Sequence, residues 1–181
     1  MPIKNSMTRW GHVAQLLHWV IVVLISIQVF LGLKAVDLPL GMRKLALLAQ
    51  HKSFGMTILA LALLRLLWRA ANRTPELPDT LKSWERSLAH VTHWGLYGLL
   101  FALPITGWLM SSARGFPVSW FGLVQIPDLV SRNQALYDAM LQTHHLLVWL
   151  LGAVVLLHVG AALKHHFMLR DDVLKRMLPF T

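Results

Sequence analysis

Histidine is the residue type whose number and placement in this sequence could do chemistry. The chain of 181 residues has ten histidines and no cysteine, and several of the histidines interrupt long apolar stretches. A neutral imidazole nitrogen is a ligand for metal ions and for haem iron. Because an ionisable side chain at membrane depth is costly, each such histidine is a candidate functional residue. Without cysteine, any cofactor must be held without thioether bonds.

His144 and His158 are predicted to lie on one face of a single helix, at two depths. They are 14 residues apart, which corresponds to about 1400° of rotation and about 21 Å along a helix axis. His145 is 13 residues from His158, so about 1300° of rotation turns those two rings to nearly opposite sides. The helix phase therefore favours His144 over His145.

Each of these histidines needs a partner at a matching depth on another helix. At the outer depth, His51 is followed four residues later by Gly55, whose missing side chain would let a flat ligand approach. At the inner depth, His18 is the corresponding candidate. The predicted pairs are His51 with His144 and His18 with His158.

His93 is a rival partner for His158, because it enters another apolar stretch at a similar depth. Sequence spacing leaves both His18 and His93 open. The remaining histidines lie nearer the predicted membrane interfaces, where an imidazole can hydrogen-bond to headgroups or loops; they are His12, His90, His165 and His166.

Two facing imidazoles favour a haem over a zinc ion. Zinc usually takes four ligands from His, Cys or carboxylate, and the predicted spans contain neither Cys nor carboxylate. A haem brings four equatorial nitrogens, and its flat apolar ring suits the interior of a helix bundle. Arg65 follows His51 by 14 residues, so it could pair with a haem propionate at the inner depth. The alternative is that its guanidinium extends to the interface.

Four apolar stretches predict an all-α integral membrane protein, because a helix needs roughly 20 apolar residues to cross a bilayer. We expect a four-transmembrane-helix, up-down-up-down bundle that forms a single membrane domain over residues 1–181. The connection at 111–141 is predicted to cap the outer surface, and residues 171–178 to form a cytoplasmic amphipathic helix. The predicted spans are 13–33, 45–68, 88–110 and 142–164.

The charges predict the orientation of the bundle. Of the 17 Lys and Arg, eleven fall in the N-terminal tail, the second connection and the C-terminal tail, so both termini are expected to be cytoplasmic. All eight acidic residues lie outside the predicted spans, which argues against a proton or metal-ion transporter. A content of 56% hydrophobic and 14% charged residues argues against a soluble enzyme. The net charge of +9 is therefore not interpreted as nucleic-acid binding.

A set of short motifs runs in order along nearly the whole chain. They are His18-Trp19, HKSFG at 51–55, RLLWR at 65–69, LAHVTHWGLY at 88–97, ALPITGW at 102–108, HHLLVWLLGAVVLLH at 144–158, AALKHHF at 161–167 and DDVLKRMLP at 171–179. Together they resemble the bacterial cytochrome b561 family, which is similar to the cytochrome b subunits of nickel hydrogenases and formate dehydrogenases.

This resemblance implies a multi-pass protein of the bacterial inner membrane with two non-covalent b-type haems and quinone-linked electron transfer. Position by position, it implies that His18, His51, His144 and His158 are the axial ligands, and it demotes His93. The chain departs from some members at residues 179–181, where it lacks a strongly basic tail.

We interpret the chain as an electron-transfer oxidoreductase without a catalytic side chain. It would pass electrons between a one-electron donor, with superoxide as one candidate, and quinone. The alternative is a membrane-anchoring cytochrome b subunit of a dehydrogenase or hydrogenase. The expected partners are membrane lipid, quinone and a redox partner protein, without nucleic acid.

Two groups of polar residues are candidates for contacts with these redox partners. On the inner side, candidate quinone contacts are His93, Lys164, His165 and Asp171. On the outer side, a positive rim that could attract an anionic donor comprises Lys34, Arg43, Lys44, Lys52 and Arg114.

Overall fold

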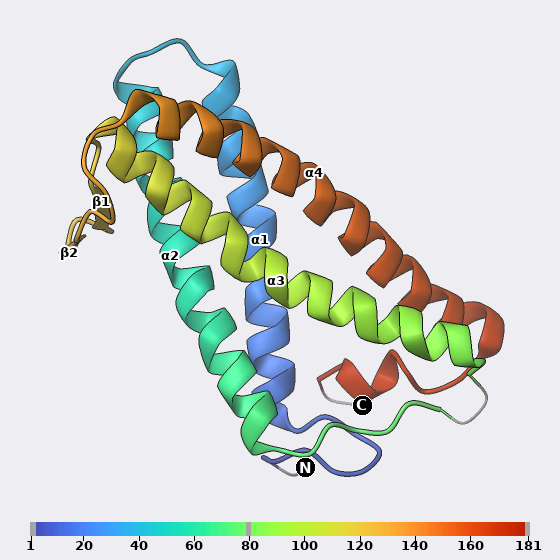
Figure 1. Ribbon diagram of the computed structural model, residues 1–181. Coiled ribbons are helices and arrows are strands. Elements are labelled where there is room, and N and C mark those ends of the chain that lie inside the picture. The colour runs from blue at the N-terminus through green and yellow to red at the C-terminus, as the bar shows by residue number, and fades with distance from the viewer. Residues whose placement is uncertain (1–2, 79–80, 180–181) are drawn as a thin grey trace.

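Four long helices make up most of the chain, which a computed structural model describes at residues 3–78 and 81–179. They are α1 (His12–Asp37), α2 (Met42–Ala71), α3 (Ser83–Arg114) and α4 (Gln134–Leu163). Each is long and apolar enough to cross a membrane. Successive helices run in opposite directions (Figure 1), so the predicted four-helix, up-down-up-down bundle is confirmed. Asp79, Phe180 and Thr181 lie outside the described residues.

The helices extend beyond the predicted spans. α3 continues to Arg114 and α4 begins at Gln134, so the connection between them is shorter than the predicted 111–141. Gly115, with φ of 75°, ends α3 in the left-handed conformation, and Asn133 caps α4 by accepting a hydrogen bond from the Leu136 amide. The helices are longer than the predicted spans because apolar content marks only the part of a helix inside the bilayer.

A two-stranded hairpin occupies the connection between α3 and α4. β1 (Val118–Trp120) pairs antiparallel with β2 (Val124–Ile126). Phe121 and Gly122 both have positive φ, of 48° and 74°, and make the turn. The Trp120 indole donates to the Thr57 hydroxyl of α2, so the hairpin is attached to the bundle.

The C-terminal tail leaves α4 through a π-helical turn at Lys164–Leu169 and ends with a 3₁₀ turn at Lys175–Met177. The predicted amphipathic helix at 171–178 was therefore wrong. The reason is a tertiary contact: Gln15 Nε2 donates to the Arg176 and Leu178 carbonyls, and Trp19 Nε1 donates to the Met177 carbonyl. These bonds to α1 hold the tail backbone in a non-helical path.

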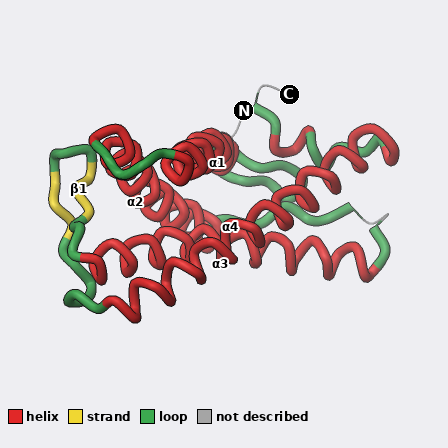
Figure 2. Tube along the Cα trace, turned by 90° about the horizontal axis from the view of Figure 1, so that it is seen from above, coloured by secondary structure: helices red, strands yellow, loops and turns green. Residues whose placement is uncertain are grey.

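The bundle has two distinct ends. The N-terminal segment, the α2–α3 connection and the C-terminal tail gather at one end, which we call the tail end; the opposite, hairpin end carries the α1–α2 loop and the β-hairpin (Figures 1 and 2). The close helix contacts are α3 with α4, α1 with α2, and α2 with α3. Large apolar side chains such as Trp149 and Leu156 are 80% and 75% exposed, as expected for a surface that faces lipid.

Candidate haem-binding sites

At the hairpin end, the structure brings His51 of α2 together with His144 of α4. Their ring centroids are 6.3 Å apart. The neighbouring His145 is exposed, whereas His144 is half-buried, in agreement with the predicted helix phase. This arrangement joins two histidines that are far apart in the sequence.

Both rings of this pair are held through their Nδ1 atoms. His51 Nδ1 lies 3.1 Å from the Gln28 carbonyl, which can only accept, so Nδ1 carries the proton. His144 Nδ1 lies 3.0 Å from the Thr106 hydroxyl, and that hydroxyl donates its own proton to the Leu103 carbonyl at 2.9 Å. His144 Nδ1 is therefore also a donor. In both rings, Nε2 keeps a lone pair that can bind iron.

The spacing of the rings fits a shared metal ion. An imidazole nitrogen binds a first-row metal ion at about 2 Å and the ring centre lies about 1 Å further, so two rings on opposite sides of one ion are about 6 Å apart. The centroid separation of 6.3 Å fits this value. Within residues 3–78 and 81–179, no group of three or more His, Asp or Glu side chains is arranged to hold a metal ion. Two imidazoles are what a haem requires, because it supplies its own equatorial nitrogens.

Two glycines lie close to the edges of these rings. A Cβ added to Gly32 of α1 would lie 3.1 Å from His51 Cε1, and one added to Gly107 of α3 would lie 3.5 Å from His144 Cε1. The first distance is closer than ordinary van der Waals contact. α1 and α3 thus each provide a glycine that leaves room for a ring and a residue that hydrogen-bonds to it.

At the tail end, the structure brings three imidazoles together. The centroid of His158 on α4 lies 6.3 Å from that of His18 on α1, and 5.2 Å from that of His93 on α3. The first separation equals that of the hairpin-end pair, whereas the second is shorter than two rings on opposite sides of one ion require. Geometry therefore favours His18 as the partner of His158, with His93 packed beside them.

Arg65 of α2 lies at this tail-end site. Its Nε donates to the Tyr97 hydroxyl at 3.2 Å, and its Nη1 donates to the Ala14 carbonyl at 3.4 Å. It also interacts electrostatically with His18 and His158. The guanidinium thus contacts both α1 and α3.

The side chain next to Gly55 is that of Gln28 on α1. A Cβ added there would lie 3.1 Å from Gln28 Nε2, and Gln28 Nε2 donates to the His51 carbonyl at 2.9 Å. The small residue therefore makes room for the side chain that bridges α1 and α2 beside the ring.

The sequence analysis missed the residues that contact the hairpin-end rings or the Arg65 side chain. A weak signal was available, because each is a polar or small residue inside an apolar stretch. They are Gln28, Gly32, Tyr97, Thr106 and Gly107.

Four membrane helices with facing imidazoles at both ends define a membrane cytochrome. The family described as prokaryotic cytochrome b561 matches residues 9–180. Cytochrome b561 homolog 2 of Escherichia coli (strain K12) is 34% identical over 98% of this chain and 95% of its own length. A probable superoxide oxidase CybB of Yersinia pestis is 38% identical over 71% of this chain and 73% of its own length.

The chain belongs to the prokaryotic cytochrome b561 family. It is accordingly a haem-binding, multi-pass electron-transfer cytochrome of a bacterial membrane. The family implies a b-type haem, and the paired imidazoles described above fit that cofactor.

Proposed function

We propose that the chain holds two b-type haems and passes electrons between them across the bacterial inner membrane. His51 and His144 would be the axial ligands at the hairpin end, and His18 and His158 those at the tail end. The single observation that supports this best is that two histidine pairs, at opposite ends of the bundle, have the same centroid separation of 6.3 Å.

The helix α4 sets the distance between the two sites, because it contributes one ligand to each. His144 and His158 are 14 residues apart, so a rigid helix holds them about 21 Å apart along its axis. When bound, each haem supplies a one-electron carrier. Because two imidazoles of the protein would hold each haem, substrate would exchange electrons without binding the iron. Arg65 would place a positive charge beside a propionate at the tail end.

The direction of the proposed path follows from charge. The tail end carries most of the Lys and Arg and is assigned to the cytoplasm. The hairpin end would then face the one-electron donor, for which superoxide is supported by the name of the Yersinia pestis relative. Quinone would accept the electrons within the membrane.

The test uses the purified protein in liposomes that contain a short-chain ubiquinone. Superoxide generated outside the liposomes should reduce the haem absorbance bands within the mixing time, and quinol should accumulate. His51→Ala should abolish reduction by superoxide, because it removes a ligand of the hairpin-end haem, whereas His145→Ala should leave it unchanged.

Two results would contradict the proposal. If superoxide fails to reduce the haem of the wild-type protein, it is not the donor. If the protein is reduced only when it co-purifies with a soluble dehydrogenase or hydrogenase, it is an anchoring subunit.

A further inference from the structure

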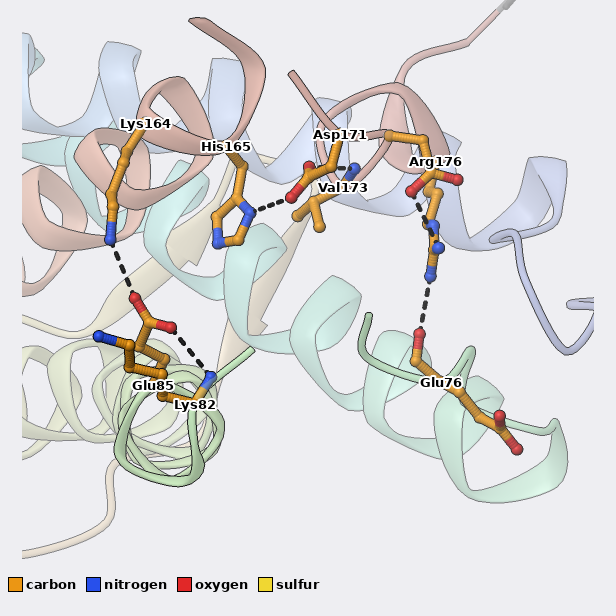
Figure 3. Close-up of polar contacts among 9 residues, drawn as sticks. Glu76, Lys82, Glu85, Lys164, His165, Asp171, Val173 and Arg176 are labelled. Atoms are coloured by element: carbon orange, nitrogen blue, oxygen red, sulfur yellow. Dashed lines mark hydrogen bonds and ion pairs between the residues drawn. The ribbon is translucent and has the colours of Figure 1, made fainter. Parts of the chain in front are cut away.

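A histidine and an aspartate face each other at the tail end, outside the proposed haem sites. His165 Nδ1 lies 2.5 Å from Asp171 Oδ2. Figure 3 shows the ring and the carboxylate pointing toward one another. The two side chains are 12% and 20% exposed, so the pair is partly shielded but keeps a route to solvent.

His165 continues the histidine-bearing face of α4. It follows His158 by seven residues, which corresponds to about 700° of rotation and about 10 Å along a helix. Seven residues bring the side chain back to within about 20° of the same face. His165 lies in the π-helical turn, and such turns are frequent at functional sites. The pair therefore lies beyond His158 in the chain direction of α4, toward the tail end.

Asp171 is oriented so that it can hold the imidazole. Its Oδ1 accepts a hydrogen bond from the Val173 amide at 3.1 Å, while Oδ2 contacts His165 Nδ1. An aspartate in this position fixes the orientation of the imidazole ring. The ring nitrogen Nε2 remains to give up and take back a proton.

Two ion pairs involve residues close to His165 and Asp171 in the sequence. From α3, Glu85 forms an ion pair with Lys164 at 2.9 Å (Figure 3). In the tail, Arg176 donates to Asp172, and this hydrogen bond lowers the pKa of that carboxyl below its ordinary value. The adjacent His166 has a buried Nδ1 without a hydrogen-bond partner in the described part of the chain. Among these groups, His165 is the imidazole that a carboxylate orients.

We propose that His165, oriented by Asp171, is the proton donor for quinone reduced at the tail end; this rests on the proposed function. Reduction of a quinone to a quinol takes two electrons and two protons. The electrons would arrive one at a time through the tail-end haem site. His165 Nε2 would give its proton to the quinone oxygen that faces it and would be reprotonated from tail-end solvent. The second oxygen would take its proton from the same solvent.

The experiment separates proton transfer from electron transfer by changing the acceptor. Haem in the purified protein is reduced chemically and mixed with either a short-chain ubiquinone or ferricyanide, which takes an electron without a proton. His165→Asn should slow re-oxidation by the ubiquinone about 100-fold, which is the low end for loss of a general acid. Re-oxidation by ferricyanide should be unchanged. His166→Asn is the matched control and should behave as wild type with both acceptors.

Asp171 is tested as a positioning residue. Asp171→Asn should slow the ubiquinone reaction severalfold and leave the ferricyanide reaction unchanged, and Asp171→Glu should restore part of the rate. In liposomes with the tail end inward, a pH dye in the lumen should report alkalinisation during quinone reduction. Its initial rate should fall in His165→Asn as quinone reduction slows. The solvent deuterium isotope effect on re-oxidation by ubiquinone should also differ between wild type and this variant.

The outcomes are distinguishable. If ubiquinone does not oxidise the reduced wild-type protein, the proposed function fails, and this inference fails with it. If it does, but His165→Asn reacts at the wild-type rate, only the proton-donor assignment is wrong. Slowing with both acceptors would show that His165 has a structural role and would also overturn the assignment.

Discussion

At the scale of single residues, the hydrogen bonds to Nδ1 decide which nitrogen of each hairpin-end histidine is available to iron. A carbonyl accepts from His51, and a hydroxyl whose own proton is already donated accepts from His144. These contacts come from α1 and α3, which contribute no ligand of their own to this pair. Partners of this kind fix ring orientation and raise ligand basicity.

Replacement of Thr106 tests this role. Thr106→Val keeps the shape of the side chain but leaves His144 Nδ1 without its acceptor, so haem affinity at the hairpin end should fall about 10- to 100-fold. The rate of haem transfer to an excess of apomyoglobin measures the loss. Thr143→Val is the control, because the Thr143 hydroxyl donates to the Ala139 carbonyl of its own helix. Equal haem retention in the two variants would contradict the role of Thr106.

At this scale, the sequence predicted which histidines lie close together better than it predicted which other residues contact their rings. Spacing along one helix gives both depth and phase, which is why His144 could be separated from His145. Spacing does not give the angle between two different helices, so it could not decide whether His18 or His93 is the partner of His158. Gln28 and Thr106 were missed because a single polar residue in a span has no periodicity to reveal it.

At the scale of elements, the sites depend on how closely the helices approach. Gly32 allows α1 to lie against the His51 ring, and Gly55 allows the Gln28 side chain to cross between α1 and α2. The helices themselves were predictable from apolar length. The hairpin and the tail were not, because both depend on hydrogen bonds to distant residues: the Trp120 side chain donates to Thr57, and the tail backbone accepts from Gln15.

A larger residue at Gly32 should displace the His51 ring. Gly32→Val should reduce haem content to about one haem per chain, because it disturbs the hairpin-end pair and leaves the tail-end pair in place. Gly95→Val in α3 is the control, since no atom lies within 4 Å of a Cβ added there. Haem content is measured as the pyridine haemochrome. A full haem complement in Gly32→Val would show that the close approach is not required.

At the scale of the whole molecule, charge divides the bundle into two unlike ends. The predicted positive rim lies at the hairpin end, where Lys44 and Lys52 donate to the Leu38 and Phe116 carbonyls and Arg114 donates to Gln134. A positive rim raises the local concentration of an anionic donor.

Neutralising part of this rim should lower the rate at which an anionic donor reduces the protein. The double variant Lys34→Gln with Arg43→Gln should lower the rate of haem reduction by superoxide about two- to threefold at low ionic strength, with a smaller difference in high salt. Stopped-flow absorbance measures the rate. Lys4→Gln with Lys82→Gln removes the same charge from the tail end and should have no effect. A rate that is independent of the rim charges would rule out steering.

Haem stoichiometry tests the central claim, that two imidazole pairs hold two haems, most directly. Pyridine haemochrome quantitation of the purified wild-type protein should give two haems per chain, as two bis-histidine sites require. His144→Ala and His158→Ala should each retain about one, at opposite ends of the bundle, and His145→Ala should retain both. A wild-type content of one haem per chain, or an undiminished content in His158→Ala, would contradict the account.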